Sequence, residues 1–308
     1  MVTQAPWPEA TPAQVAPGGG SARRGHGRGP YHRHVFLAID IGNSAAKAAA
    51  VEGSTIHSAG RLDTSAATGD DLLDGLRVLA GARDEPPAGI IAASVVDRWT
   101  ERLERAAAAM DLPLTVVAAS HIPISTTLVR PDQVGPDRLV AAWAATQLLG
   151  SPAIIIDLGT ATTVDAVDED GFFLGGAILP GLELAAESLA EGTARLPRIE
   201  LRLPREAIGT DTASAITSGI VLGHIGAVRE LALRMHERLD RGGASGRATR
   251  VVVTGGYSAA SWAEAAWREP AGPGLPAIAD ERDPDLVLRG LGLLAEQLRE
   301  RPAAGGVR

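Results

Sequence analysis

The segments VFLAIDIGNS, residues 35–44, and AIIIDLGTAT, residues 153–162, decide how this chain folds. Each is an apolar strand that ends in Asp, any residue and Gly, followed by small hydroxyl or amide residues. The repeat predicts an α/β protein with two similar lobes, each carrying one glycine turn and one strand-end carboxylate. We expect the lobes to span residues 35–150 and 151–300 and to face each other across a central cleft.

The chemistry of the repeated turn suits a nucleotide phosphate. Gly42 and Gly159 can take positive φ and have no Cβ, so backbone N–H groups can approach a phosphate closely. Asp40 and Asp157 would hold Mg²⁺ or its water ligands, because a hard cation relieves the repulsion between a carboxylate and a phosphate. A single Asp-x-Gly turn is usually an ordinary hairpin. The second copy favours a phosphate site, and because the sequence has no Walker A pattern, it would not be a P-loop.

Composition narrows the class of protein. The chain has 308 residues, enough for two lobes with a full core, and a net charge of −8, which argues against general nucleic-acid binding. It has no cysteine, so disulfides, thiol catalysis and cysteine-bound zinc are excluded. We find no apolar run of membrane-spanning length and no secretory signal. We therefore expect a cytoplasmic protein without a nucleic-acid or membrane partner.

Both ends of the chain have the composition of unfolded segments. Residues 1–34 are rich in Pro, Gly, Arg and His, which predicts a disordered, dispensable N-terminal tail. Its basic and histidine residues could touch acidic surfaces or bind a metal loosely. Residues 301–308 are expected to form a flexible C-terminus.

Helical and strand patterns alternate through the rest of the chain. Helices are expected at residues 70–79, 98–110, 139–149, 183–190, 213–239 and 285–297, with Asp97 capping the second. The long helix at 213–239 contains Gly219, Gly223 and Gly226, which lower helix stability and indicate close packing, either in a dimer or within the chain. A strand from Val251 ends in the pair Gly255–Gly256, which would admit a flat adenine or ribose, or form a plain turn.

Two further features carry candidate chemistry. Lys47 is the only lysine among 29 basic residues, which suggests a need for a compact positive charge near phosphates. Asp137 falls in the first turn of a helix that Gly135 and Pro136 begin, where the helix dipole favours its charged form. From spacing alone, Asp137 either satisfies the helix end beside a solvated Arg138, or accepts a proton from a substrate hydroxyl while Arg138 binds an anion.

The motifs, in order and spacing, resemble those of type III pantothenate kinases from about Val35 to Leu298. They are Asp40-x-Gly42-Asn43, Gly135-x-Asp137-Arg138, Asp157-x-Gly159-Thr160-Ala161-x-Thr163-x-Asp165, Gly175-Gly176-x-Ile178-x-Pro180-Gly181, Thr254-Gly255-Gly256 and the ending at residues 284–291. The resemblance implies an actin-like ATPase fold of two ribonuclease-H-like lobes and a homodimer. It also implies ATP-dependent phosphorylation of pantothenate to 4'-phosphopantothenate, the first step of coenzyme A biosynthesis.

The resemblance also assigns roles to individual residues. It implies that a first phosphate loop binds ATP together with Thr160, the loop consisting of Asp40, Ile41, Gly42, Asn43, Ser44, Ala45, Ala46 and Lys47. Gly135, Pro136, Asp137 and Arg138 would contact pantothenate, with Asp137 as the proton acceptor. Asp157 would be tied to a monovalent cation, K⁺ or NH₄⁺, and Thr212 would touch substrate.

The chain departs from the family pattern beside the substrate residues. Similar members carry Asn-x-Tyr-x-x-Pro before the Gly-x-Asp-Arg motif, and Thr126 and Leu128 stand at the Asn and Tyr places here. Leu128 would line the pantothenate pocket without the aromatic ring and hydroxyl of Tyr. Asp211 stands where Asn is common, adding a negative charge. These departures keep two alternatives open, a kinase of another small polyol and a degenerate member acting as a regulatory accessory protein.

Overall fold

The computed structural model describes residues 11–12, 34–82, 85–242, 246–267 and 278–300. Its chain divides into two compact units, one of residues 1–121 with 287–308 and one of residues 122–286. The predicted disordered tail and flexible C-terminus fall almost wholly outside the described residues. Within the tail, Thr11–Pro12 form a two-residue strand, β1, that pairs antiparallel with β4.

The first unit contains a sheet in the order β1-β4-β3-β2-β5-β6. Its strands are β2 (Phe36–Ile41), β3 (Ala45–Glu52), β4 (Thr55–Asp63), β5 (Ile90–Ser94) and β6 (Leu114–Val116). The strands β2, β3 and β4 form an antiparallel meander, and β5 and β6 continue parallel to β2. Because β2 is central and buried on both faces, it reads as an almost continuous apolar run.

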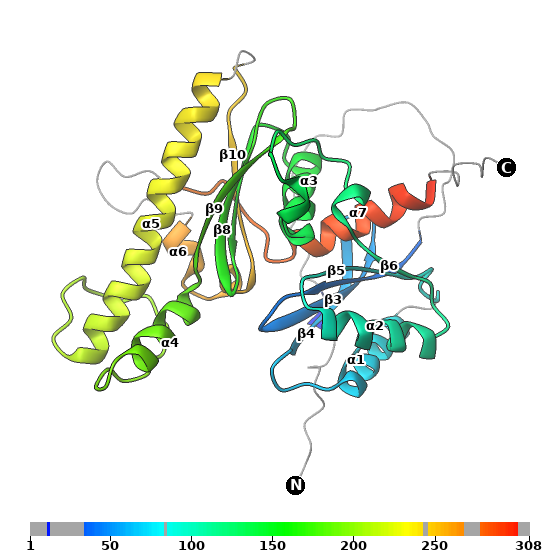
Figure 1. Ribbon diagram of the computed structural model, residues 1–308, viewed down its shortest axis with the longest axis horizontal. Coiled ribbons are helices and arrows are strands. Elements are labelled where there is room, and N and C mark those ends of the chain that lie inside the picture. Colours follow the sequence, from blue (N-terminus) through cyan, green and yellow to red (C-terminus); the bar gives the residue numbers. More distant parts are fainter. Residues whose placement is uncertain (1–10, 13–33, 83–84, 243–245, 268–277, 301–308) are drawn as a thin grey trace, which may run out of the picture. The chain divides into compact units, whose positions relative to one another are not determined.

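The second unit repeats this sheet. Its strands are β7 (Ala153–Leu158), β8 (Ala161–Val167), β9 (Phe173–Pro180), β10 (Arg250–Thr254) and β11 (Glu281–Arg282). Their order is β11-β10-β7-β8-β9, with β7, β8 and β9 antiparallel and β10 and β11 parallel to β7. Strand for strand this is the order β6-β5-β2-β3-β4 of the first unit. The protein therefore has the actin-like ATPase fold, built from two ribonuclease-H-like lobes, as predicted (Figure 1).

The first sheet packs against α1 (Gly69–Gly81) and α2 (Asp97–Ala109). Thr68 caps α1 by accepting from the Asp71 N–H, while Asp71 accepts from the Thr68 N–H in return. The predicted capping of α2 by Asp97 is wrong: Asp97 is the first helical residue, and no side chain caps this helix. The core between sheet and helices includes Leu37, Ile39, Ile41, Leu72, Leu76, Trp99 and Leu103.

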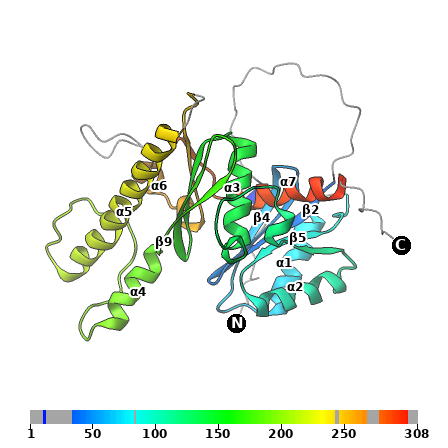
Figure 2. The ribbon, with the colours of Figure 1, turned by 45° about the horizontal axis from the view of Figure 1, so that its top comes forward.

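The second sheet carries α3 (Pro136–Leu148) on one face and α5 (Thr212–Gly242) on the other, as Figures 1 and 2 both show. The alternation of side chains along β7 and β8 shows which residues face α5 and which face α3. Ile154, Ile156 and Val164 belong to a core cluster with Val221 and Val228 of α5. Since successive strand residues point to opposite faces, the intervening Asp157, Thr163 and Asp165 point toward α3. The α3 face of the second sheet is therefore the polar one.

The remaining elements are short or belong to the closing segment. They are α4 (Leu182–Gly192), α6 (Ala263–Trp267), α7 (Leu286–Glu300) and the 3₁₀ turns η1 (Ala119–His121), η2 (Pro131–Gln133) and η3 (Gly256–Ala259). The helix that follows the first lobe's last strand, α3, belongs to the second unit, and most of α7 belongs to the first. The compact units are thus divided differently from the repeated sequence, whose lobe limits of 35–150 and 151–300 stay a prediction.

Helix α5 extends beyond its predicted range of 213–239, and it contains an apolar stretch of membrane-spanning length that the sequence analysis did not expect. Residues 212–241 are long and apolar enough to cross a membrane by length and composition, although half of the most apolar window is buried inside the protein. A core helix of a soluble protein has the same properties, and in α5 the buried residues follow one stripe against the sheet. We interpret α5 as such a core helix.

Candidate active site

The start of α3 presents the Asp137 carboxylate. Gly135 is the N-cap residue, Pro136 occupies the first helical position, and Asp137 Oδ1 accepts the backbone N–H of Arg138 at 2.9 Å. A Cβ on Gly135 would lie 2.4 Å from Asp137 Oδ1. Any side chain at position 135 would therefore displace the carboxylate, which explains why glycine precedes Asp137 by two residues.

Burial changes the protonation of Asp137. Desolvation raises the pKa of its carboxyl group, and the backbone N–H and the charge of Arg138 oppose this rise without cancelling it. The sequence had predicted the opposite direction, because the helix dipole favours the charged form. At this helix end the loss of water outweighs the dipole, so Asp137 is a better proton acceptor than an exposed aspartate.

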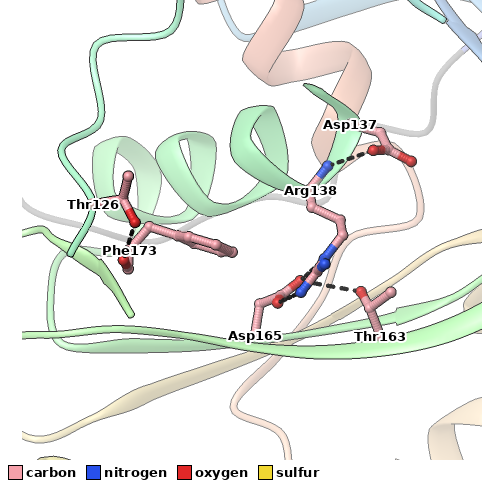
Figure 3. Close-up of polar contacts among 6 residues, drawn as sticks. All are labelled: Thr126, Asp137, Arg138, Thr163, Asp165 and Phe173. Carbon is pink, nitrogen blue, oxygen red and sulfur yellow. Dashed lines mark hydrogen bonds and ion pairs between the residues drawn. The ribbon is translucent and has the colours of Figure 1, made fainter. Parts of the chain in front are cut away.

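Arg138 is held by a buried ion pair rather than by solvent (Figure 3). Its Nε donates to Asp165 Oδ2 at 3.0 Å, and its Nη2 donates to Asp165 Oδ1. The side chains of Arg138 and Asp165 are only 17% and 2% exposed. Thr163 Oγ1 donates to Asp165 Oδ2 at 3.2 Å, and the Phe173 ring lies 5.9 Å from the guanidinium carbon. The interpretation of Arg138 as a solvated surface charge is therefore wrong.

Asp165 was not among the predicted site residues, although it lies inside a quoted motif. The sequence could have indicated its importance, because a charged residue between the apolar strand residues Val164 and Ala166 needs a partner when it is buried. Gly176, directly opposite on β9, gives the carboxylate its space: a Cβ there would lie 2.4 Å from Asp165 Oδ1 and 2.1 Å from the Val164 carbonyl oxygen. Gly176 thus makes room for the ion pair.

The second glycine turn lies at the end of β7 on the same polar face. Asp157 pairs with Thr163 across the hairpin and with Thr254 of β10. A Cβ on Gly255, whose φ is +89°, would lie 2.2 Å from Asp157 Oδ1, so only glycine fits beside this carboxylate. Thr160 is exposed at the tip of the turn, and its carbonyl oxygen accepts the Gly181 N–H at 3.0 Å.

The first glycine turn belongs to the first unit and is held by hydrogen bonds from Thr64. Thr64, 2% exposed, donates its hydroxyl to the Asn43 carbonyl oxygen at 2.7 Å, and its N–H donates to the Ser44 carbonyl oxygen. Asn43 and Ser44 are exposed at the tip, whereas Ile41 and Ala46 point into the core. Of the predicted ATP loop, the side chains of Ile41 and Ala46 therefore cannot touch a ligand. Thr64 was missed because nothing in its local sequence distinguishes it.

The expected role of positive φ at the turn glycines is wrong. Among the described glycines, positive φ occurs at Gly53, Gly150, Gly171, Gly175, Gly246 and Gly255, and at neither Gly42 nor Gly159. The Gly42 N–H donates to the Ala45 carbonyl oxygen at 2.9 Å, so it serves the hairpin and not a phosphate. Across the same hairpin Lys47 is the direct partner of Asp40. Facing residues of a hairpin share a side of the sheet, which puts both charges on the face opposite α1 and α2.

The segment before α3 contains Thr126 and Leu128, the two residues that depart from the family pattern. Thr126 Oγ1 donates to the Phe173 carbonyl oxygen at 2.8 Å and accepts the Leu128 N–H at 3.1 Å. The Leu128 side chain reaches within 3.1 Å of the place that a Cβ on Gly175 would take. Thr126 therefore fastens this segment to β9, and Leu128 forms an apolar wall above Gly175.

Residues at the start of α5 lie apart from α3. Thr212 is exposed and begins α5, the helix on the other sheet face, so the structure does not bring it beside Asp137. The Asp211 carboxylate accepts the Ser214 N–H at 2.9 Å, and this hydrogen bond and that of the Ser214 hydroxyl lower its pKa. Asp211 thus caps its own helix, which accounts for its negative charge at this position.

A cation at the second glycine turn would need phosphate oxygens among its ligands. Across the part of the chain that the structure describes, no three or more His, Cys, Asp or Glu side chains gather to hold a metal. Asp157, half-buried beside the space that Gly255 and Gly159 leave open, offers an anionic oxygen where a cation bound to ATP could be shared. The residues present fit a cation that arrives with the nucleotide.

The fold and the polar residues at these turns define an ATP-dependent phosphotransferase of the actin-like ATPase fold. Sequence comparison gives the family: the profile described as Type III pantothenate kinase matches residues 36–234. A type III pantothenate kinase of Dehalococcoides mccartyi is 38% identical over 84% of this chain and 96% of its own length, and one of Rubrobacter xylanophilus is 37% identical over 84% and 97%. The chain belongs to the type III pantothenate kinase family.

Solved structures resemble the protein at low sequence identity. The ethanolamine utilization protein EutJ of Carboxydothermus hydrogenoformans is 15% identical, covers 86% of this chain and 90% of its own, and has a TM-score of 0.48.

Proposed function

We propose that this protein phosphorylates the terminal hydroxyl of pantothenate with ATP, giving 4'-phosphopantothenate and ADP in the first step of coenzyme A biosynthesis. Family membership over most of the chain supports this activity. The structural observation that carries it is Asp137, a half-buried carboxylate with a raised pKa at the start of α3. The accessory-protein and polyol-kinase alternatives gain no support from the relatives, which carry the kinase name.

In the proposed reaction, the substrate hydroxyl oxygen attacks the γ-phosphorus while the bond from that phosphorus to the ADP oxygen breaks. Asp137 accepts the hydroxyl proton, and its raised pKa brings it nearer to the pKa that suits a general base at neutral pH. The transition state is loose, so alignment of the hydroxyl matters more than early removal of its proton. The fixed hydrogen bond from Arg138 N–H to Asp137 supplies that alignment.

Arg138 would help to hold the substrate carboxylate together with Gly135 and Pro136. A guanidinium carries five N–H donors, so Arg138 can bind Asp165 and still donate to a second carboxylate. The ion pair fixes the guanidinium before substrate arrives, which lowers the entropy lost on binding. Leu128 would contribute an apolar wall to the same pocket, and Thr212 stays a proposed substrate contact.

The phosphates of ATP would be bound by the two glycine turns, with Asp40 and Asp157 beside them. Mg²⁺ arriving with ATP would neutralise phosphate charge, and a monovalent cation, K⁺ or NH₄⁺, would be tied to Asp157. Lys47, opposite Asp40 on the hairpin, balances the charge of that carboxylate in the first turn. Asn43, Ser44 and Thr160 are exposed at the turn tips, as side chains that contact ATP must be.

The protein would act as a cytoplasmic homodimer. A Cβ at Gly219, Gly223 or Gly226 would meet no described atom within 4 Å, other than the helix's own neighbouring backbone, so close packing against the described residues does not explain these glycines. All three are exposed, and they leave a smooth face on α5. A second copy packed on this face would explain why the helix tolerates residues that lower its stability.

The activity is tested by incubating the purified protein with ATP, Mg²⁺ and pantothenate and detecting phosphopantothenate by mass spectrometry. We expect product, and a lower rate when K⁺ and NH₄⁺ are replaced by a bulky organic cation. Phosphorylation of a polyol in place of pantothenate would contradict the proposed substrate. Nucleotide binding without any phosphoryl transfer would contradict the enzyme assignment.

A further inference from the structure

A titratable side chain, His224, lies in the buried stripe of α5. His224 lies between Val221 and Val228, both fully buried, and is itself only 9% exposed. Burial lowers the pKa of its imidazole, which keeps the ring neutral. An apolar residue would fill this position without the desolvation of an imidazole, so the histidine calls for a reason.

That reason lies on the neighbouring strand. His224 Nε2 is 3.0 Å from Thr162 Oγ1, a hydroxyl whose residue is 1% exposed. Thr162 pairs with Leu158 and so closes the hairpin that carries Gly159 and Thr160. The hydrogen bond therefore joins the middle of α5 to the base of the second glycine turn.

The turn is also held from its other end. Gly181, just before α4, donates its N–H to the Thr160 carbonyl oxygen, and a Cβ at Gly181 would lie 2.3 Å from the Gly159 carbonyl oxygen. Because the Gly181 contact fixes the tip and the His224 contact fixes the base, the turn has little freedom to rotate about its strand. A phosphate site made of backbone groups depends on such fixed orientation.

We propose that His224 is a positioning residue for the nucleotide, holding Thr162 so that the Gly159–Ala161 turn keeps the geometry that binds phosphate. This role rests on the proposed function only in that the ligand of the turn is ATP. It does not involve Asp137 or Arg138, which lie on the other face of the second sheet. His224 touches neither reactant and acts through Thr162.

The test compares nucleotide and pantothenate affinities in isolated variants. His224→Phe keeps an aromatic ring but removes the hydrogen bond, His224→Gln can restore a polar contact to the hydroxyl, and Thr162→Val removes the other half of the pair. We expect Phe and Val to weaken the binding of a fluorescent ADP analogue and to raise the KM for ATP by about five- to tenfold, the effect of one hydrogen bond. The KM for pantothenate and kcat at saturating ATP should stay near the wild-type values.

Three comparisons separate this role from a purely structural one. Ser218→Ala is the matched control, because its buried hydroxyl lies on the same helix but donates to the Ala207 carbonyl oxygen, away from the turn. The double variant His224→Phe/Thr162→Val should bind nucleotide about as weakly as either single variant, since both remove one interaction. His224→Gln should recover most of the affinity.

Three results would overturn the proposal. One is unchanged nucleotide affinity in folded His224→Phe, and another is equal weakening of ATP and pantothenate binding. The third is a loss in Ser218→Ala as large as in Thr162→Val. Since nucleotide binding is measured without pantothenate, failure of the proposed substrate leaves this test intact. If His224→Phe does not fold, Thr162→Val and His224→Gln still decide the outcome.

Discussion

At the residue scale, the chemistry is concentrated in Asp137. Asp137→Asn keeps the size and the hydrogen bond from Arg138 but removes the proton acceptor, so we predict a fall in kcat of about 10²- to 10⁴-fold. Nucleotide affinity should stay unchanged, because Asp137 does not belong to either glycine turn. Steady-state kinetics and an ADP-analogue titration measure the two effects. Activity close to wild type would remove Asp137 from the mechanism.

The same residue predicts a pH dependence of activity. If Asp137 must be ionised, log(kcat/KM) should fall with decreasing pH below its raised pKa, and the acid limb should lie above the ordinary aspartate range near about 4. The pH–rate profile, measured with pantothenate below its KM, locates that limb. An acid limb at or below the value of an exposed aspartate would contradict the burial argument.

Stability should change with pH in a sense that the raised pKa fixes. The folded protein holds the Asp137 proton more tightly than the unfolded chain, so the free energy of unfolding falls as pH rises from the unfolded to the folded pKa. Asp137→Asn removes this loss, so the variant should gain stability relative to wild type at pH 7 and gain less at pH 4. Urea unfolding at both pH values measures the difference. Equal differences at both would show that Asp137 does not titrate as described.

The ion pair beneath Asp137 predicts a large cost for removing one partner. Asp165→Asn leaves the Arg138 guanidinium, 17% exposed, without its counter-charge, and we expect unfolding to become easier by about 3 to 5 kcal/mol. The double variant Asp165→Asn/Arg138→Gln should recover part of this loss. Glu230→Gln is the control, since its pair with Arg234 is exposed and worth about 0.5 kcal/mol or less. Losses of similar size in Asp165→Asn and Glu230→Gln would contradict the importance of burial.

At the scale of elements, the sequence predicted what strand and helix patterns encode locally. The two hairpins and their terminal aspartates followed from residues 35–44 and 153–162, and six helices lie close to their expected ranges. The short strand β11 was missed because two residues carry no periodicity. The ion pair of Arg138 with Asp165 could not be placed, because it joins a helix to a strand of another segment and depends on the space that Gly176 leaves.

Helix α5 predicts a contact between copies. Gly223→Leu places a branched side chain on the exposed glycine face, where a Cβ would meet no described atom within 4 Å other than the helix's own neighbouring backbone, so we expect the monomer to fold as before. We expect the dimer to weaken at least about tenfold in dissociation constant, since a side chain would separate the two backbones. Gly81→Leu, at an open position on α1, is the control. Light scattering over a dilution series measures both, and an unchanged dimer would move the interface away from α5.

At the scale of the whole molecule, the repeated strand-and-turn segment determines the architecture. The two sheets share one strand order, so each lobe delivers one aspartate and one glycine turn at the carboxyl end of its first strand. The presence of two similar lobes was predictable from the repeated segments. The assignment of α3 to the second unit and of most of α7 to the first was not. Long-range packing of that kind leaves no local mark in the sequence, because the apolar face of a helix does not specify its partner.

The central claim is that Asp137 directs the pantothenate hydroxyl at the γ-phosphate of an ATP whose phosphates the 159–161 turn binds. A crystal structure with a non-hydrolysable ATP analogue, Mg²⁺ and pantothenate tests it most directly. We predict hydrogen bonds to the phosphates from the 159–161 turn, and the substrate hydroxyl within hydrogen-bond distance of Asp137. A nucleotide whose phosphates do not contact the 159–161 turn, or a substrate hydroxyl beyond hydrogen-bond distance of Asp137, would contradict the account.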